Sequence, residues 1–145
     1  MGVQRIVIGT DGSEGATKAM VWCAALAAQL GAEVVAIYSY SPLDVLDEHP
    51  GTDLGDLADL AVARLRDEWC APLTAAGVAF RCDLVEDLPV EALVATATEE
   101  SADLIVIGSH GRSGWRERIM GRTATGLPHH APCPFTVVPH DRPDA

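Results

Sequence analysis

A loop rich in glycine and basic residues follows an apolar run in the last third of this chain. The run Ala102–Gly108 is typical of a buried strand, and the loop that leaves it extends to Arg122. Gly108, Gly111 and Gly121 allow backbone N–H groups to turn toward a ligand, because no Cβ atom stands in the way. Such amides suit an anion, and a polyphosphate is the usual one. Further donors in the loop are Ser109, His110, Arg112, Ser113, Arg116, Arg118 and Arg122.

The basic loop contrasts with the charge of the whole chain, which is −11 over 145 residues. A field of that sign repels phosphate, so the local basicity is informative. The same charge argues against nonspecific binding to nucleic acid or to anionic membranes. A hydrophobic content of 48% with 21% charged residues predicts a globular protein, and the length predicts one domain, residues 1–145.

The sequence also predicts where the protein resides. No apolar run reaches the roughly 18 residues that span a bilayer. The N-terminus enters a strand pattern directly and lacks the layout of a signal peptide. The four cysteines are scattered, without a Cys-x-x-Cys pair, so we expect reduced thiols in a cytoplasmic protein.

Strands and helices alternate along the chain. Apolar and β-branched runs predict strands at 3–10, 33–40, 78–85, 103–108 and 134–139. Helical spacing predicts helices at 13–30 and 54–69, a helix starting at Pro89, and a short segment at 123–130. Strands joined by helices of crossover length form parallel βαβ units, so we expect an open α/β sheet with helices on both faces.

Ligands of such sheets bind beyond the carboxyl ends of the strands, where the strand order reverses. Two predicted strands end in unusual loops, the first in Gly9–Gly15 and the fourth in Gly108–Gly111. In the first loop, Asp11 either binds a ligand or organises the turn and caps the following helix. Ser13 is an equally good cap, which leaves Asp11 for a ligand.

From end to end the chain resembles the universal stress protein family, and its C-terminal third resembles the ATP-binding branch. The family spacing of Gly, two residues, Gly, nine residues and Gly is met by Gly108, Gly111 and Gly121. Thr10–Glu14 and His130–Pro134 are also similar to family segments. The resemblance implies a doubly wound five-stranded parallel sheet with strand order 3-2-1-4-5. It also implies a homodimer paired through the last strand, Phe135 to Val138.

The resemblance further implies an adenine nucleotide, ATP first of all, lying across strands one and four. Asp11 would then contact the ribose hydroxyls, Thr10 would line the same pocket, and Ser39 would meet the adenine edge through its backbone. Gly108 would approach the ribose. The residues along the phosphates would be His110, Gly111, Arg112 and Gly121.

The chain departs from the family pattern at Arg122, where the ATP-binding branch has Ser or Thr. A guanidinium could hold phosphate oxygens bidentately, or it could turn to solvent and leave the helix uncapped. Thr123 or Thr125 could supply the missing hydroxyl instead.

Two functions of different classes remain open. The first is regulatory binding of ATP, AMP or cyclic AMP, with slow or no hydrolysis, because no nucleophile or carboxylate is spaced to form a triad with His110. Mg²⁺ could accompany the phosphates or bind the acidic loop from Asp44 to Asp59, although that loop lacks the ligand spacing of a calcium loop. The second, motivated by Arg122, is a family member without nucleotide binding that acts through homodimerisation and protein contacts.

Overall fold

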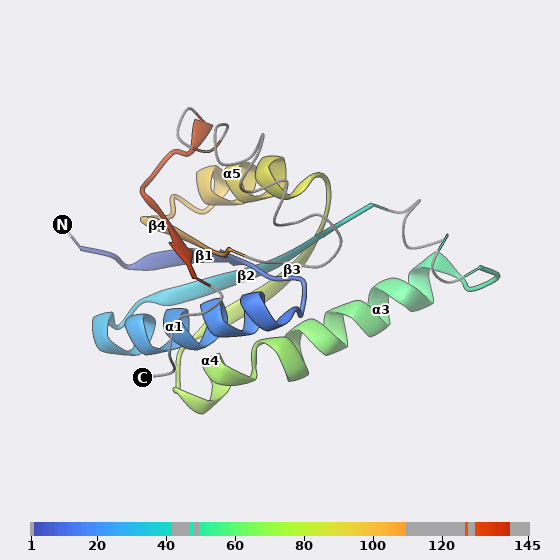
Figure 1. The fold of residues 1–145 in the computed structure, drawn as a ribbon, viewed down its shortest axis with the longest axis horizontal. Helices are drawn as coiled ribbons and strands as arrows, with labels where there is room; N and C mark the ends of the chain where they lie inside the picture. Colours follow the sequence, from blue (N-terminus) through green and yellow to red (C-terminus); the bar gives the residue numbers. More distant parts are fainter. Residues whose placement is uncertain (1, 42–46, 48–49, 110–126, 128–129, 140–145) are drawn as a thin grey trace.

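A parallel sheet with helices on both faces forms the body of the protein (Figure 1). The computed structural model describes residues 2–41, 47, 50–109, 127 and 130–139. The strands are β1 (Arg5–Gly9), β2 (Glu33–Tyr40), β3 (Phe80–Glu86), β4 (Leu104–Gly108) and β5 (Phe135–Val138). Their order is β3-β2-β1-β4-β5, and every neighbouring pair is parallel. The predicted fold class and strand order are therefore confirmed.

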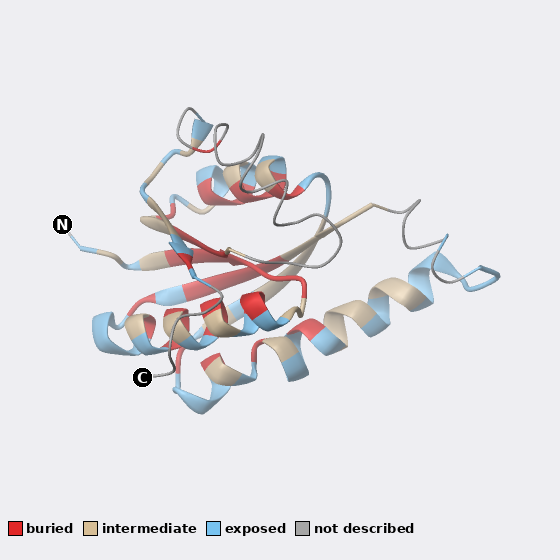
Figure 2. Ribbon diagram, in the orientation of Figure 1, coloured by how far each residue is buried: buried red, intermediate tan, exposed pale blue. Residues whose placement is uncertain are grey.

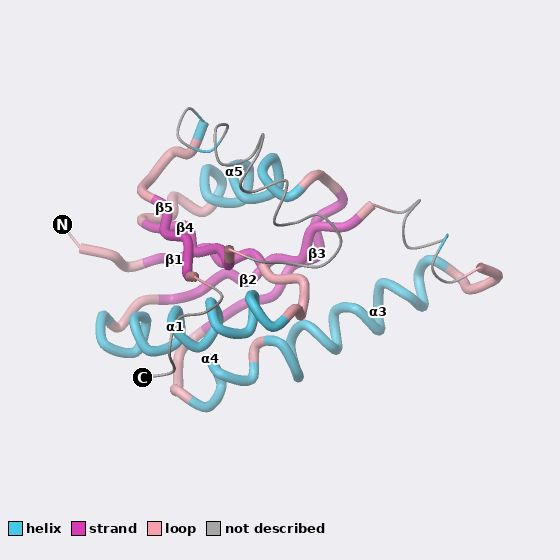
Figure 3. The backbone as a smooth tube through the Cα atoms, viewed as in Figure 1, coloured by secondary structure: helices cyan, strands magenta, loops and turns pink. Residues whose placement is uncertain are grey.

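The helices divide between the two faces of the sheet. On one face lie α1 (Glu14–Leu30), α3 (Leu54–Arg64), a π-helical turn η1 (Leu65–Trp69) and α4 (Ala71–Ala75), and on the other lies α5 (Pro89–Glu99) (Figure 3). The predicted ends of the first helix are confirmed. Ser13 is its N-cap, and Gly31 closes it in the left-handed conformation at φ 65°. Among the described residues, no helix has the length and apolarity to cross a membrane.

The central strands of the sheet are buried (Figure 2), and each face of the sheet packs in its own apolar cluster. Ile6 and Ile8 of β1 pack with Met20 and Leu73 on the side of α1 and α4. Val7, between them in the sequence, points to the α5 side. Alternate residues of a strand point to opposite faces, so a strand buried on both faces is apolar throughout. This accounts for the unbroken apolar pattern of β1 and β4.

The structure of residues 54–69 differs from the prediction made from their sequence. One continuous helix is expected over 54–69, but α3 ends at Arg64 and a π-helical turn follows. None of the residues of α3 is buried, whereas Leu65 in the π-helical turn is fully buried. The reason is the position of α3, which contacts the edge strand β3 and extends away from the sheet (Figure 1). Its apolar stripe therefore stays half-buried or exposed.

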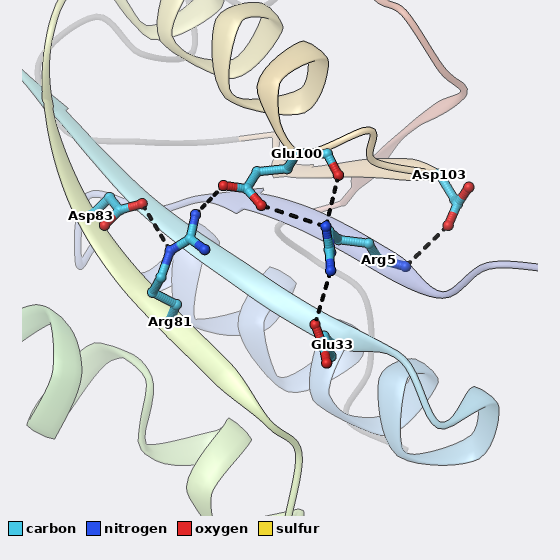
Figure 4. Close-up of polar contacts among 6 residues, drawn as sticks. All are labelled: Arg5, Glu33, Arg81, Asp83, Glu100 and Asp103. Carbon is cyan, nitrogen blue, oxygen red and sulfur yellow. Dashed lines mark hydrogen bonds and ion pairs between the residues drawn. The ribbon is translucent and has the colours of Figure 1, made fainter.

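Charged side chains gather at the amino-terminal edge of the sheet (Figure 4). Arg5 pairs with Glu33 at 3.3 Å and with Glu100 at 3.6 Å. Arg81 pairs with Asp83 at 3.3 Å and also with Glu100. A cavity of about 170 Å³ opens here. Because carboxylates already neutralise both guanidinium groups that line it, this edge is poorly suited to an anionic ligand.

Asp103 ties the start of β4 to the start of β1. Its carboxylate accepts hydrogen bonds from the backbone N–H groups of Gln4, at 2.9 Å, and of Arg5, at 3.1 Å. The two amides stabilise the ionised form, so they hold the pKa of Asp103 below its usual range.

Candidate functional site

The carboxyl ends of β1 and β4 meet where the strand order reverses. The central strand β1 lies between β2 and β4, and the ladders pair Gly9 with Ile37 and Ile8 with Val106. When the two pairing registers are continued past the last paired residues of β1, four of the predicted site residues lie at the same edge of the sheet. They are Thr10, Asp11, Ser39 and Gly108.

The turn after β1 satisfies much of its own hydrogen-bonding capacity. The N–H of Gly12 donates to Thr10 Oγ1 at 3.2 Å, and the N–H of Ser13 donates to Asp11 Oδ1 at 3.0 Å. The N–H of Thr10 donates to the carbonyl of Ile37 at 3.0 Å, which ties the turn to β2. The amides of Gly12 and Ser13 are thus engaged within the turn rather than directed at a ligand. Its distinctive group is the carboxylate of Asp11, a hydrogen-bond acceptor.

Asp11 and Ser13 share the structural tasks that the sequence left open. Ser13 caps α1, with its Oγ accepting from the N–H of Ala16 at 3.2 Å. Asp11 organises the turn and is only 5% exposed. A carboxylate can accept several hydrogen bonds, so the bond from the Ser13 N–H is compatible with contact to a ligand hydroxyl. The structure thus establishes the turn role of Asp11, and its ligand role stays a prediction.

Gly108 allows β4 to end directly against α1. A Cβ atom at this position would lie 2.8 Å from the carbonyl oxygen of Gly15 and 3.3 Å from the N–H nitrogen of Ala16. Contacts that short with backbone are not tolerated without a shift of one element. The glycine is therefore required by packing, a reason that its loop position in the sequence does not reveal. Thr10, 2% exposed, is buried at the same edge.

Trp69 covers the turn after β1. A Cβ atom on Gly12 would lie 2.2 Å from Cε2 of the Trp69 ring. The ring also makes an edge contact with Tyr38 of β2, with ring centroids 5.2 Å apart. The Arg64 guanidinium lies 5.5 Å from the centroid of the same ring. Apart from the glycine of an Asp-Gly turn, no sequence signal connects these residues, because 57 positions separate Gly12 from Trp69.

The remaining predicted site residues lie outside the described part of the chain. They are His110, Gly111, Arg112, Gly121, Arg122 and Thr123. In the acidic loop from Asp44 to Asp59 that could bind Mg²⁺, residues 44–46 and 48–49 lie outside it as well. Within the residues that the structure does describe, no three His, Cys, Asp or Glu side chains form a group that could hold a metal ion.

The contact between Gly12 and Trp69 can be tested by substitution. Gly12 has φ of 75°, and Gly31 has a similar φ of 65° but open space around it. The variant Gly31→Ala should lose about 1–2 kcal/mol of unfolding free energy, from backbone strain alone. The variant Gly12→Ala should lose about 1–3 kcal/mol more, because the methyl group also displaces the indole. Urea denaturation of both variants measures the difference, and equal losses would contradict the packing of Trp69 on Gly12.

Comparisons with known proteins agree with this architecture. A model of the universal stress protein family matches residues 2–139. A universal stress protein from Methanocaldococcus jannaschii is 31% identical over 145 residues, which cover 93% of this chain and 81% of that protein. One from Mycobacterium tuberculosis is 30% identical over 135 residues, covering 91% of this chain but 44% of that longer relative.

A solved structure is similar over nearly the whole chain. It is a universal stress protein in complex with cAMP, 27% identical, with a TM-score of 0.71 over 97% of this chain and 100% of that one. The match of the family model to residues 2–139, together with the confirmed strand order, establishes that this chain belongs to the universal stress protein family.

Proposed function

We propose that this protein binds an adenine nucleotide, ATP first of all, as a regulatory ligand at the carboxyl ends of β1 and β4. The observation that carries the proposal is the buried carboxylate of Asp11, 5% exposed, held at the point where the strand order reverses. The solved universal stress protein with cAMP, 27% identical to this chain, supports an adenine ligand. Mg²⁺ would accompany ATP as the counterion of its phosphates.

Each part of the nucleotide has a suitable group at this edge. The carboxylate of Asp11 is a strong acceptor for the ribose hydroxyls, with Thr10 beside it. Ser39 of β2 would meet the adenine edge through its backbone, and Gly108 would lie beneath the ribose. The phosphates would extend along the glycine-rich loop and its donors, which lie outside the described residues: His110, Gly111, Arg112, Gly121, Arg122 and Thr123.

We propose a regulatory ligand rather than a substrate. A nucleotide shifts a conformational equilibrium only by the difference in its affinity for the two states. Because the sequence places no general base by a recognisable motif, slow or absent hydrolysis is expected. The output would then be a changed conformation or a changed contact with a protein partner.

A substitution that removes the charge of Asp11 but keeps an acceptor oxygen tests its ligand role separately from its role in the turn. In Asp11→Asn, the amide oxygen can still accept from the N–H of Ser13, so the unfolding free energy should change little. Loss of the charge-assisted bonds to the ribose should weaken ATP binding about tenfold or more. Asp53→Asn is the matched control, since Asp53 caps α3 by accepting from the amides of Gly55 and Asp56.

Isothermal titration of the wild type and both variants with ATP, AMP and cyclic AMP measures these effects. Absence of binding heat for all three ligands with the wild type would overturn the proposal. If the wild type and Asp11→Asn bind the nucleotides with equal affinity, Asp11 acts only in organising the turn.

The departure at Arg122 has its own test. As a phosphate ligand, the guanidinium pairs more strongly with the several charges of ATP than with the single charge of cyclic AMP. The variant Arg122→Ser should therefore weaken ATP binding about tenfold while changing cyclic AMP binding little. Isothermal titration of the same variant with both nucleotides makes cyclic AMP the control ligand for ATP. A gain in ATP affinity would instead identify Arg122 as an obstacle to binding.

A second candidate function, action through homodimerisation, is favoured by the open edge of β5. Ile105 and Ser109 donate their N–H groups to the carbonyls of Pro134 and Val138. In a parallel sheet, successive residues of a strand direct their backbone N–H and C=O groups to alternate sides of that strand. The N–H and C=O of Val137 therefore point away from β4. The side chain of Val137 is 37% exposed. Within the described residues no strand covers this edge, which could pair with a second copy.

The dimer prediction can be checked by sedimentation equilibrium. We expect the wild type to be a dimer and Val137→Lys to be a monomer, because the ammonium group would be buried without a partner at the paired edge. Val21→Lys, at an exposed valine of α1, should remain dimeric. A wild type that is monomeric at every concentration would contradict the prediction.

A further inference from the structure

Two cysteines distant in the sequence lie with their sulfur atoms side by side. The Sγ atoms of Cys70 and Cys82 are 3.8 Å apart, a separation that is hydrogen-bond range for sulfur. Cys70 follows the π-helical turn η1, and Cys82 lies on the edge strand β3. Both are free thiols. A disulfide needs an S–S separation of about 2.05 Å, so the two sulfurs must approach by about 1.8 Å.

The two thiols have different surroundings. Cys70 is fully buried, whereas Cys82 is only half-buried, so a soluble oxidant reaches Cys82 first. The hydrogen bond shared with Cys70 lowers the pKa of Cys82, and the nearby Arg66 guanidinium lowers it further, against the effect of burial. The same hydrogen bond, together with burial, raises the pKa of Cys70. A partly exposed reactive thiolate beside a second thiol that resolves it is typical of redox-sensitive cysteine pairs.

We propose that Cys70 and Cys82 form an oxidative modification site, at which a hydroperoxide converts the two thiols into a disulfide. The Cys82 thiolate attacks one oxygen of hydrogen peroxide, the O–O bond breaks, and hydroxide leaves. The Cys82 sulfenic acid is then attacked by the sulfur of Cys70, the S–O bond breaks, and the leaving hydroxide takes up the Cys70 proton as water. In total, two thiols lose two electrons and two protons, and one peroxide is reduced to two waters.

The other two cysteines lack this combination. Cys23 is fully buried in α1, and burial raises its pKa to about 12. Cys133 is half-buried like Cys82, but burial and, to a lesser degree, the Asp103 carboxylate raise its pKa. The thiolate is the reactive form, so both should react more slowly than Cys82. Cys133 is therefore the matched control for exposure.

Mass spectrometry of the wild-type protein tests the proposal directly. Trypsin cleaves after Arg66, Arg81 and Arg112, so Cys70 and Cys82 fall in separate peptides, 67–81 and 82–112. After limited hydrogen peroxide and alkylation of the remaining thiols in denaturant, two of the four cysteines should be unalkylated. The two peptides should appear joined, about 2 Da lighter than their sum through loss of two hydrogen atoms. Dithiothreitol should release them.

Two variants distinguish this site from random oxidation. In Cys70→Ser, we expect Cys82 to be trapped as a sulfenic acid by dimedone. In Cys82→Ser, Cys70 should stay reduced. Cys133→Ser should form the Cys70–Cys82 link at the wild-type rate. The proposal is overturned if the wild type forms no link between the two peptides while folded, or if Cys133 oxidises as fast as Cys82. Because the wild-type result decides on its own, instability of a variant leaves the test intact.

Discussion

The first turn of α1 lies directly against the end of β4, with no side chain between the two backbones. A Cβ atom on Gly108 would come within 2.8 Å of the Gly15 carbonyl, so this contact exists only because the strand ends in glycine. Since Ser13, the N-cap of α1, follows directly on the turn that carries Asp11, the contact also fixes that turn relative to β4. The position of the Asp11 turn relative to β4 therefore depends on this close approach. A larger residue would separate the two elements and widen the edge at which we propose the nucleotide.

The two edges of the sheet differ in how their charges are used. At the amino-terminal edge, the guanidinium groups of Arg5 and Arg81 are neutralised by carboxylates from β2, β3 and the end of α5. At the carboxyl edge, the Asp11 carboxylate accepts from the backbone N–H of Ser13, and Thr10 Oγ1 accepts from that of Gly12. A carboxylate favours hydroxyl donors and repels phosphate, so phosphate must be bound by other groups. The basic residues of the glycine-rich loop are the natural candidates, and this is why the proposed site spans two loops.

The π-helical turn η1 connects these features to the rest of the helical layer. It ends at Trp69, which packs on Gly12, and Cys70 follows immediately, beside Cys82. A π-helical turn rotates the residues that follow it relative to a regular helix. The π-helical turn therefore positions both Trp69, which covers the turn after β1, and Cys70, which lies beside Cys82 at the edge of the sheet.

The sequence by itself predicted the five strands, the helix capped by Ser13, the helix that starts at Pro89 and the edge at which polar loops gather. Apolar runs, the Ser13 cap and the stop at Gly31 are local signals, and alternating strands and helices restrict the topology to parallel βαβ units. Only the tertiary structure decided that Gly108 is needed for packing on α1, that Trp69 covers Gly12, that α3 extends beyond the sheet with no buried residue, and that Cys70 meets Cys82. Each of these depends on contacts between segments far apart in the chain or on a change of helical geometry, and periodicity along the sequence carries no information on either.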